Sequence, residues 1–202
     1  MKNLVIGQSG GPTAVINASL YGAVKAFRES GADGHVLGMI NGIEGFLADH
    51  VMDLSTDLSD KELELLKLTP AAYLGSCRYK LPENLDASVY TLLFEKFEQL
   101  NIGAVFYIGG NDSMDTVDAL SQWAKANNID KRFVGIPKTV DNDLMVTDHC
   151  PGFASGAKFA NEVVNATWLD YNVYTREEVF ILETMGRSEE RRVGKECRSR
   201  WS

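Results

Sequence analysis

Cysteine and histidine are both rare in this sequence, with three of each among 202 residues. Cys77, Cys150 and Cys197 lie far apart and show no metal-ligand spacing, and the three histidines are equally scattered. We therefore expect neither a zinc site nor a disulfide framework. An odd, sparse set of cysteines is typical of reduced thiols in the cytosol.

Long hydrophobic runs are also missing. No apolar segment is long enough to cross a bilayer, and the N-terminus has no basic region followed by an apolar stretch. The strand-like residues 4–6 are far too few for a signal peptide. We therefore expect a cytoplasmic protein with no membrane partner.

Positive charge is scarce as well, since the formal net charge is −8 at pH 7. An acidic chain argues against general binding of nucleic acids, which are themselves polyanions. If the substrate carries phosphate, its attraction must come from local cations, helix N-termini or a metal ion.

The remaining composition is that of a globular protein, with 45% hydrophobic and 24% charged residues. Short apolar runs alternate with amphipathic stretches, which predicts right-handed crossovers and a mainly parallel sheet. Ligands of such sheets bind beyond the carboxyl ends of the strands. We expect strands at residues 3–6, 34–39, 104–108, 133–136 and 179–182, and helices at residues 14–29, 59–67, 87–100, 112–127 and 155–169.

Residues 187–202 differ from the rest of the chain. They contain six of the 20 Lys and Arg residues, three acidic residues and no apolar periodicity. A basic disordered tail is one interpretation. We favour a second one, in which residues 188–202 are the translation of a sequencing adapter and Arg187 belongs to either part.

A glycine-rich segment, GQSGGPT, follows the first expected strand and precedes a helix. Its glycines permit a tight turn and a close approach to a ligand. Pro12 suits a first helical turn, and the amide groups of such a turn favour an anion. The segment matches neither the P-loop nor the dinucleotide fingerprint. A plain tight turn explains it about as well as a phosphate cradle does.

A second glycine pair, in GGNDSMDT, again lies between an expected strand and a helix. Asp112 or Ser113 as a helix cap would account for this composition. The functional interpretation is that Gly109 and Gly110 admit a phosphate while Asn111 and Asp112 hold Mg²⁺ through oxygen atoms.

A third segment, PKTVDND, ends the next expected strand. A turn explains it cheaply, because Asp and Asn side chains bond their own backbone. Phosphoryl transfer to an alcohol needs the same residue types: a base for the hydroxyl proton, a cation and hydrogen-bond donors.

Taken in order, these segments resemble the phosphofructokinase family, and the resemblance spans residues 1–186. The family implies a Rossmann-like, mainly parallel α/β sheet with flanking helices, truncated here before its completion. It also implies three parts: an incomplete phosphoryl-donor domain at 1–143, the start of a sugar-phosphate-binding domain at 144–186, and the non-native tail at 187–202. The matching residues are Gly10 and Gly11, 74–78 (LGSCR), 109–113 (GGNDS), 139–143 (TVDND), and Met185, Gly186 and Arg187.

The resemblance also implies roles for single residues. Arg78 would stabilise the phosphoryl group in flight, since a planar guanidinium suits phosphate oxygens. Asp141 would take the proton from the sugar 1-hydroxyl, while Thr139 and Asp143 would position the sugar phosphate and the reacting groups. Gly11, Gly110 and Ser113 would contact the phosphoryl donor, and Met185, Gly186 and Arg187 would line the fructose 6-phosphate site together with Thr139 and Asp141.

Two positions bear on the donor. Where ATP-using family members have glycines, this chain has Asp112 and Lys138, as in the pyrophosphate-dependent branch. A carboxylate at Asp112 would fill and charge the space that a nucleotide phosphate needs, and Lys138 would supply a cation. Asn111 stands where the family usually has Asp, and a neutral amide is a weaker Mg²⁺ ligand.

We therefore expect a Mg²⁺-dependent, reversible transfer from pyrophosphate to fructose 6-phosphate in glycolysis, by a homo-oligomer when full-length. The 202-residue chain alone should be inactive or poorly soluble, because family members complete this domain with later chain. The alternatives are an ATP-dependent 6-phosphofructokinase, or a non-catalytic sugar-phosphate-binding protein, to which Asn111 points. Lipid and NAD kinases share the glycine turn, but the match at 139–143 and at Met185 and Gly186 argues against them.

Overall fold

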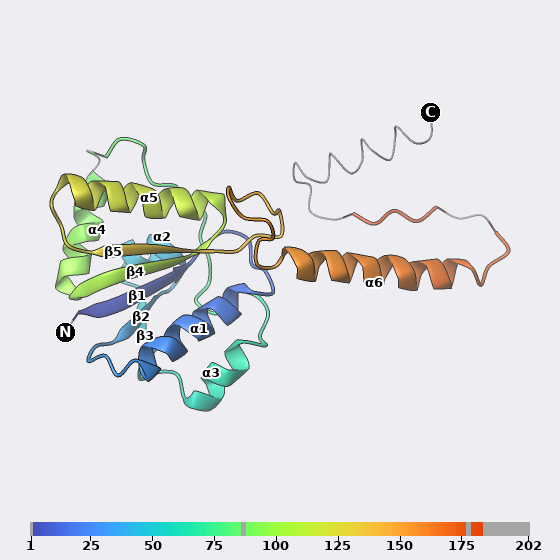
Figure 1. Ribbon diagram of the computed structural model, residues 1–202, viewed down its shortest axis with the longest axis horizontal. Coiled ribbons are helices and arrows are strands. Elements are labelled where there is room, and N and C mark those ends of the chain that lie inside the picture. Colours follow the sequence, from blue (N-terminus) through green and yellow to red (C-terminus); the bar gives the residue numbers. More distant parts are fainter. Residues whose placement is uncertain (1, 86–87, 177–178, 184–202) are drawn as a thin grey trace. The chain divides into compact units, whose positions relative to one another are not determined.

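The computed structural model describes residues 2–85, 88–176 and 179–183, and it divides the chain into two compact units, Met1–Lys138 and Thr139–Ser202 (Figure 1). Met185, Gly186, Arg187 and the expected tail at 187–202 lie outside the described residues.

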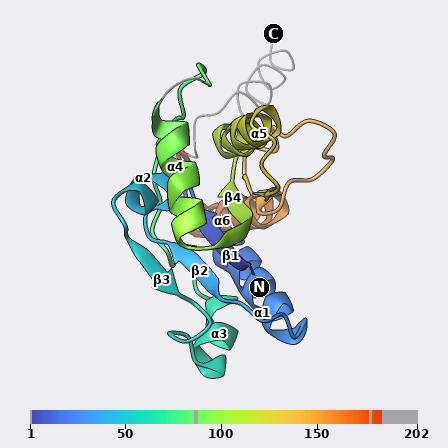
Figure 2. The ribbon, with the colours of Figure 1, turned by 90° about the vertical axis from the view of Figure 1, so that its left-hand side faces the viewer.

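The first unit is built on a five-stranded sheet with the order β3-β2-β1-β4-β5. All neighbours in it are parallel except β3, which runs antiparallel to β2. Figure 2 shows β3, β2 and β1 side by side in this order. After β1 the chain adds β2 and β3 on one side of this strand, and it later adds β4 and β5 on the opposite side. The strands are β1 (Asn3–Gln8), β2 (Val36–Met39), β3 (Val51–Asp53), β4 (Ile102–Gly109) and β5 (Arg132–Pro137).

Helices cover both faces of this sheet (Figure 1). One apolar cluster joins α2, α4 and α5 to one face, and a second cluster joins α1 and α3 to the other. The central strand serves both clusters, since Val5 belongs to the first while Leu4 and Ile6 belong to the second. A continuous apolar strand is what burial on both faces requires. The helices are α1 (Ile16–Glu29), α2 (Gly42–Leu47), α3 (Asp60–Leu66), α4 (Ser88–Gln99) and α5 (Asn111–Ala126).

The second unit consists of a loop followed by α6 (Phe153–Tyr171). Thr139 and Gly152 form an isolated parallel bridge that closes the loop at the base of this helix. No residue of α6 is buried. Within the described part of the chain, no helix combines the length and the apolar character needed to span a membrane.

Every expected helix and the first four expected strands are present, with ends that differ by a few residues. Ser59 caps α3 in a reciprocal capping box with Glu62. The strand expected at 179–182 is wrong, because the described residues there form no regular structure. Val179 is 89% exposed and Ile181 is 82% exposed, and no strand in the described part of the chain pairs with this segment.

Two elements were not expected from the sequence. Helix α2 begins after Asn41, whose left-handed backbone (φ 58°) is hard to foresee at a helix start. Strand β3 has three residues and is set by its antiparallel pairing with β2, not by any pattern of its own.

Candidate active site

The carboxyl ends of β1 and β4 are adjacent in the sheet, with Gln8 opposite Ile108. Since the chain departs from β1 in one direction and reaches β4 in the other, the strand order reverses between them. Ligands of open α/β sheets bind at such a point, beyond the carboxyl ends of the strands. Both expected glycine loops begin here, one after Gln8 and one at Gly109.

The two glycine loops are joined by a serine pair, in which the hydroxyls of Ser9 and Ser113 are hydrogen-bonded to each other. Gly109 makes this approach possible. A Cβ atom at Gly109 would lie 1.9 Å from Ser113 Oγ and 2.8 Å from Ser9 Oγ, so no larger residue fits without rearrangement. Ser113 was expected at the site, whereas Ser9 was not.

Gly110 is the N-cap of α5, and no side chain caps this helix. The capping interpretation of Asp112 or Ser113 is therefore wrong. Asn111 and Asp112 form the first turn and are exposed. A helix of 16 residues places the positive end of its dipole and its first amide groups at this glycine turn, which favours an anion.

Lys138 lies at the end of β5 and reaches the first glycine loop. Its side chain is buried, with 4% of the residue exposed, and Nζ donates a hydrogen bond to the carbonyl oxygen of Gly11. Its own amide donates to the carbonyl of Gly109 at 2.9 Å. A Cβ atom at Gly10 would lie 3.3 Å from Nζ. One residue thus contacts both glycine loops and brings an ammonium group between them.

A third loop, which carries Arg78, is attached to the first glycine loop. The amide of Gly10 donates to the carbonyl of Cys77 at 3.0 Å, and the hydroxyl of Ser76 donates to the carbonyl of Gly10. The Arg78 side chain is exposed, and no ion pair or side-chain hydrogen bond involves it within the described residues. The guanidinium is therefore accessible to a ligand.

Tyr107 has a buried hydroxyl group near these loops. Burial first, and then the neighbouring Cys77, raise the pKa of Tyr107 well above its usual range, so this phenol stays neutral and is unsuited as a base. Its oxygen accepts a hydrogen bond from the amide of Ile43 at 3.4 Å.

Thr13 Oγ1, in the first glycine loop, is buried and has no hydrogen-bond partner among the described residues. A ligand oxygen at that loop could supply the missing partner.

The carboxylate motif belongs to the second unit. Thr139 Oγ1 accepts a hydrogen bond from the amide of Asp141 at 3.0 Å. Asn142, at φ 51°, accepts a hydrogen bond from the amide of Cys150 at 2.8 Å. Asp141 is half-buried and Asp143 is exposed. The segment thus bends at Val140 and Asp141, is held by these two hydrogen bonds, and follows Lys138 directly in the chain.

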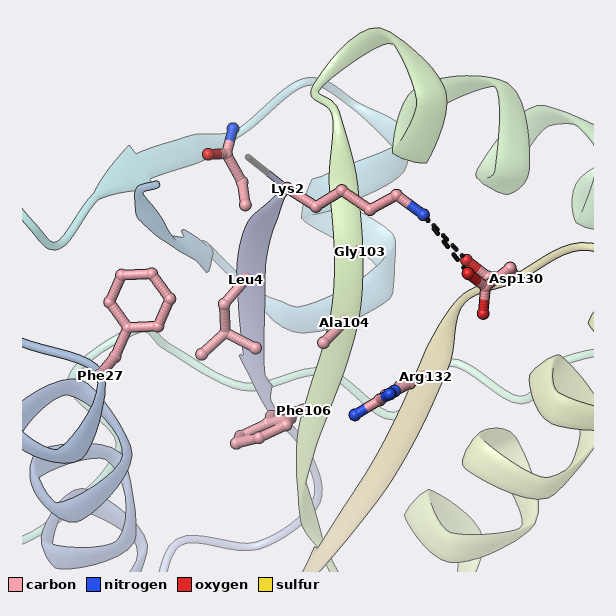
Figure 3. A pocket seen from close by; sticks show the side chains of 9 residues that line it. Lys2, Leu4, Phe27, Gly103, Ala104, Phe106, Asp130 and Arg132 are labelled. Carbon is pink, nitrogen blue, oxygen red and sulfur yellow. Dashed lines mark hydrogen bonds and ion pairs between the residues drawn. The ribbon is translucent and has the colours of Figure 1, made fainter. Parts of the chain in front are cut away.

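The other end of the sheet carries a pocket of about 400 Å³ that contains no motif residue (Figure 3). Phe27 of α1 forms one wall, and Lys2 is paired with Asp130 across the opening. This pocket lies at the amino ends of β1 and β4, away from the glycine loops. The sequence motifs, and not this pocket, therefore define the candidate site.

Asn111 and Asp112 are the candidate metal-binding residues beside the second glycine loop. The described residues include no group of three or more His, Cys, Asp and Glu side chains that could hold a metal ion. Asn111 and Asp112 nevertheless present one amide and one carboxylate beside the glycine turn. Mg²⁺ commonly takes one or two protein oxygens together with substrate phosphates and water, and this donor set fits that mode.

The family model described as phosphofructokinase matches residues 3–190. A curated relative, the pyrophosphate–fructose 6-phosphate 1-phosphotransferase of Xanthomonas campestris pv. campestris, is 43% identical over 188 residues, which are 92% of this chain and 44% of the relative. The sulfofructose kinase of Alkalicoccus urumqiensis is 37% identical over 186 residues, which are 92% of this chain and 46% of that protein. Relatives named ATP-dependent 6-phosphofructokinase are 28% identical.

Among solved structures, the pyrophosphate-dependent phosphofructokinase of Marinobacter aquaeolei matches with a TM-score of 0.84 and 42% identity. The match covers 93% of this chain and 46% of that one. The chain thus spans somewhat less than half the length of these relatives.

Proposed function

The chain belongs to the phosphofructokinase family, and from this we propose that the full protein transfers a phosphoryl group from pyrophosphate to the 1-hydroxyl of fructose 6-phosphate. The products are fructose 1,6-bisphosphate and phosphate, and the transfer is reversible. The family membership and the names of the 40–43% identical relatives support this proposal.

The observation that carries the proposal is the buried ammonium of Lys138 on the Gly11 carbonyl. A cation fixed between two glycine loops suits a short, highly charged donor such as pyrophosphate. The Asp112 carboxylate in the first turn of α5 adds repulsion against a further phosphate group.

On the donor side, the glycine loops and the start of α5 bind the pyrophosphate. Gly11 and Gly110 let its oxygens approach the backbone, and the Ser113 hydroxyl lies at the same turn. Arg78 reaches the transferring group from the third loop and balances the charge that develops on its oxygens. The sequence alone predicted each of these four residues for the site.

On the acceptor side, Asp141 takes the proton of the sugar 1-hydroxyl as this oxygen attacks the terminal phosphorus. The bond from that phosphorus to the bridging oxygen breaks, and phosphate leaves. Thr139 fixes the Asp141 backbone through its hydroxyl, and Asp143 positions the reacting groups. Met185, Gly186 and Arg187, outside the described residues, complete the sugar site in this proposal.

Mg²⁺ belongs to the proposal as a companion of pyrophosphate. Asn111 and Asp112 would hold it, directly or through water, and it would neutralise charge on the phosphate oxygens. Because the amide of Asn111 is a weak ligand, pyrophosphate and water would supply most of the oxygen atoms that coordinate Mg²⁺.

The organisation follows from the same proposal. Residues 1–143 would form the donor domain, residues 144–186 the start of the sugar-phosphate domain, and residues 187–202 a non-native tail. The full protein would act in the cytoplasm as a homo-oligomer, with small-molecule substrates and neither nucleic acid nor a membrane as a partner.

A second candidate function concerns the sugar. The sulfofructose kinase relative, at 37% identity, shows that members close to this chain are named for a sulfonated sugar. The choice between a phosphate and a sulfonate at carbon 6 would depend on sugar-site residues beyond those described.

Phosphorus NMR of the full protein with fructose 6-phosphate, pyrophosphate and Mg²⁺ tests the proposal. We expect a new phosphate-ester signal and inorganic phosphate in equal amounts. An unchanged spectrum, with transfer seen only when ATP or a sulfonated sugar is supplied, would contradict it.

A further inference from the structure

Two amide side chains at the start of the first unit are completely enclosed. Gln8, the last residue of β1, is 0% exposed, and Asn17, in the first turn of α1, is 1% exposed. Nε2 of Gln8 donates to Asn17 Oδ1 at 3.1 Å and to the carbonyl of Ile16 at 3.2 Å. A buried amide pair stabilises a structure only when its remaining donors and acceptors are also satisfied.

The remaining groups of this pair all bond the segment that leads to Arg78. Asn17 Nδ2 donates to the carbonyl of Thr69 at 2.9 Å and to that of Pro70 at 3.3 Å. Asn17 Oδ1 accepts from the amide of Tyr73 at 2.8 Å, and Gln8 Oε1 accepts from the amide of Leu74 at 2.9 Å. Four hydrogen bonds thus fix residues 69–74, one of them to Gln8 at the end of β1 and three to Asn17 at the start of α1.

The fixed segment then turns toward the glycine loop. Gly75 adopts φ 72°, and Ser76 and Cys77 bond Gly10 through a side-chain hydroxyl and a carbonyl. Arg78 is the next residue, and its side chain is exposed. The segment that leads to Arg78 is therefore held at two points, by the amide pair at residues 69–74 and by Gly10 at Ser76 and Cys77.

We propose that Gln8 and Asn17 are positioning residues for Arg78, which hold its guanidinium over the first glycine loop where the phosphoryl group is transferred. This inference rests on the proposed catalytic role of Arg78. It does not depend on whether the phosphoryl donor is pyrophosphate or ATP. Misplacement of a catalytic group by about 1 Å costs about 100-fold in rate. Loosening the 69–78 segment therefore lowers kcat and leaves the KM of the sugar nearly unchanged.

Asn17→Asp tests this proposal in the full protein, because it replaces the Nδ2 donor by an oxygen that faces the carbonyls of Thr69 and Pro70. We expect a loss of about 10- to 100-fold in kcat. Asn3→Asp is the matched control. Asn3 also bridges two segments, donating to the carbonyl of Leu100 at 2.9 Å and accepting from the amide of His35 at 2.9 Å, but it lies at the amino end of β1. It should lower thermal stability and leave kcat unchanged.

A double-mutant cycle separates positioning from general destabilisation. If Asn17 acts through Arg78, Asn17→Asp costs no further activity when Arg78→Ala is already present. Equal losses in both backgrounds would overturn the proposal. Should Asn17→Asp fail to fold, Gln8→Met removes the acceptor of the Leu74 amide without adding a charge and must show the same non-additivity with Arg78→Ala. An inactive wild-type protein would refute the proposed function itself and thereby also this inference.

Discussion

Lys138 is a buried lysine at the end of β5. Lysine is rarely enclosed in a protein, and here the residue is 4% exposed and its ammonium donates a hydrogen bond to the carbonyl of Gly11. A hydrogen bond from a charged donor contributes about 1.5–3 kcal/mol. The Lys138 ammonium would also attract a phosphate oxygen bound at the glycine loops. We therefore expect this buried cation to affect which phosphoryl donor is used.

Removing both charged side chains should change that choice. We expect Asp112→Gly with Lys138→Gly to raise the KM for pyrophosphate at least tenfold and to make ATP usable, because the variant removes repulsion and opens space. Initial rates with each donor give the result. Lys96→Met, which removes another buried lysine far from the site, should leave the donor preference unchanged. No gain in ATP use by the double variant would contradict this account of specificity.

Asp141 offers a second test at the residue scale. Asp141→Asn removes the proposed base and keeps the shape of the side chain, so kcat should fall by about 10²- to 10⁴-fold. The KM values should change little, since Thr139 and Lys138 remain. Asp148→Asn, in the same loop, is the control and should retain full activity. A fully active Asp141→Asn variant would exclude this residue as the base.

At the scale of elements, apolar periodicity predicted the order of strands and helices well. The run at 104–108 and the amphipathic stretch at 112–127 correspond to β4 and α5. The strand expected at 179–182 shows the limit of such patterns, since a short apolar run cannot specify the partner that a strand requires. Helix α2 and β3 are too short to have a measurable period.

The grouping of three candidate site residues could be predicted from the sequence. Gly11, Gly110 and Lys138 follow three different strands, and the rule that ligands bind at carboxyl ends places such residues together. Ser9, Gln8 and the hydrogen bonds of Asn17 were missed, because they join segments far apart in the sequence. A buried polar residue at the end of an apolar strand, such as Gln8, is the signal that could have indicated them.

Helices α1 and α3 are linked by a charged cluster that gives a pH prediction. Lys67 first, and then Tyr21, donate hydrogen bonds that lower the pKa of Glu64 to about 2. An unfolded Glu titrates at about 4.3. The ionised Glu64 therefore stabilises the folded protein fully at a pH above the pKa of Glu64 in the unfolded chain. This stabilisation is lost as the pH falls toward the lower pKa of Glu64 in the folded protein.

Glu64→Gln should abolish this part of the acid sensitivity. We expect the urea midpoint of the variant to fall less steeply than that of the wild type between about pH 4.5 and pH 2. High salt should reduce the difference, since the cluster is exposed. Glu29→Gln, a change at an exposed glutamate of α1, is the control. Identical slopes for Glu64→Gln and the wild type would show that the cluster contributes nothing to folding.

At the scale of the whole molecule, the chain spans 44% of the length of its Xanthomonas campestris pv. campestris relative. Helix α6 presents large apolar side chains to solvent, with Phe159 68%, Trp168 62% and Leu169 71% exposed. Apolar groups that gather in this way mark contact surfaces or aggregation sites.

The isolated 202-residue chain should therefore bind a hydrophobic dye and associate with itself in a concentration-dependent manner. Phe159→Ser with Trp168→Ser should reduce both effects, as measured by dye fluorescence and analytical ultracentrifugation. Leu68→Ser, which removes an exposed leucine of the first unit, is the control and should change neither. A monomeric wild-type chain without dye binding would contradict this expectation.

The most direct test of the central claim is a coupled assay of fructose 1,6-bisphosphate formation by the full-length protein. Fructose 6-phosphate and Mg²⁺ are supplied with either pyrophosphate or ATP as the donor. The buried Lys138 at Gly11 and the carboxylate of Asp112 predict turnover with pyrophosphate and little or none with ATP. Turnover with ATP alone would contradict the assignment of the donor, and silence with both would contradict the phosphotransfer itself.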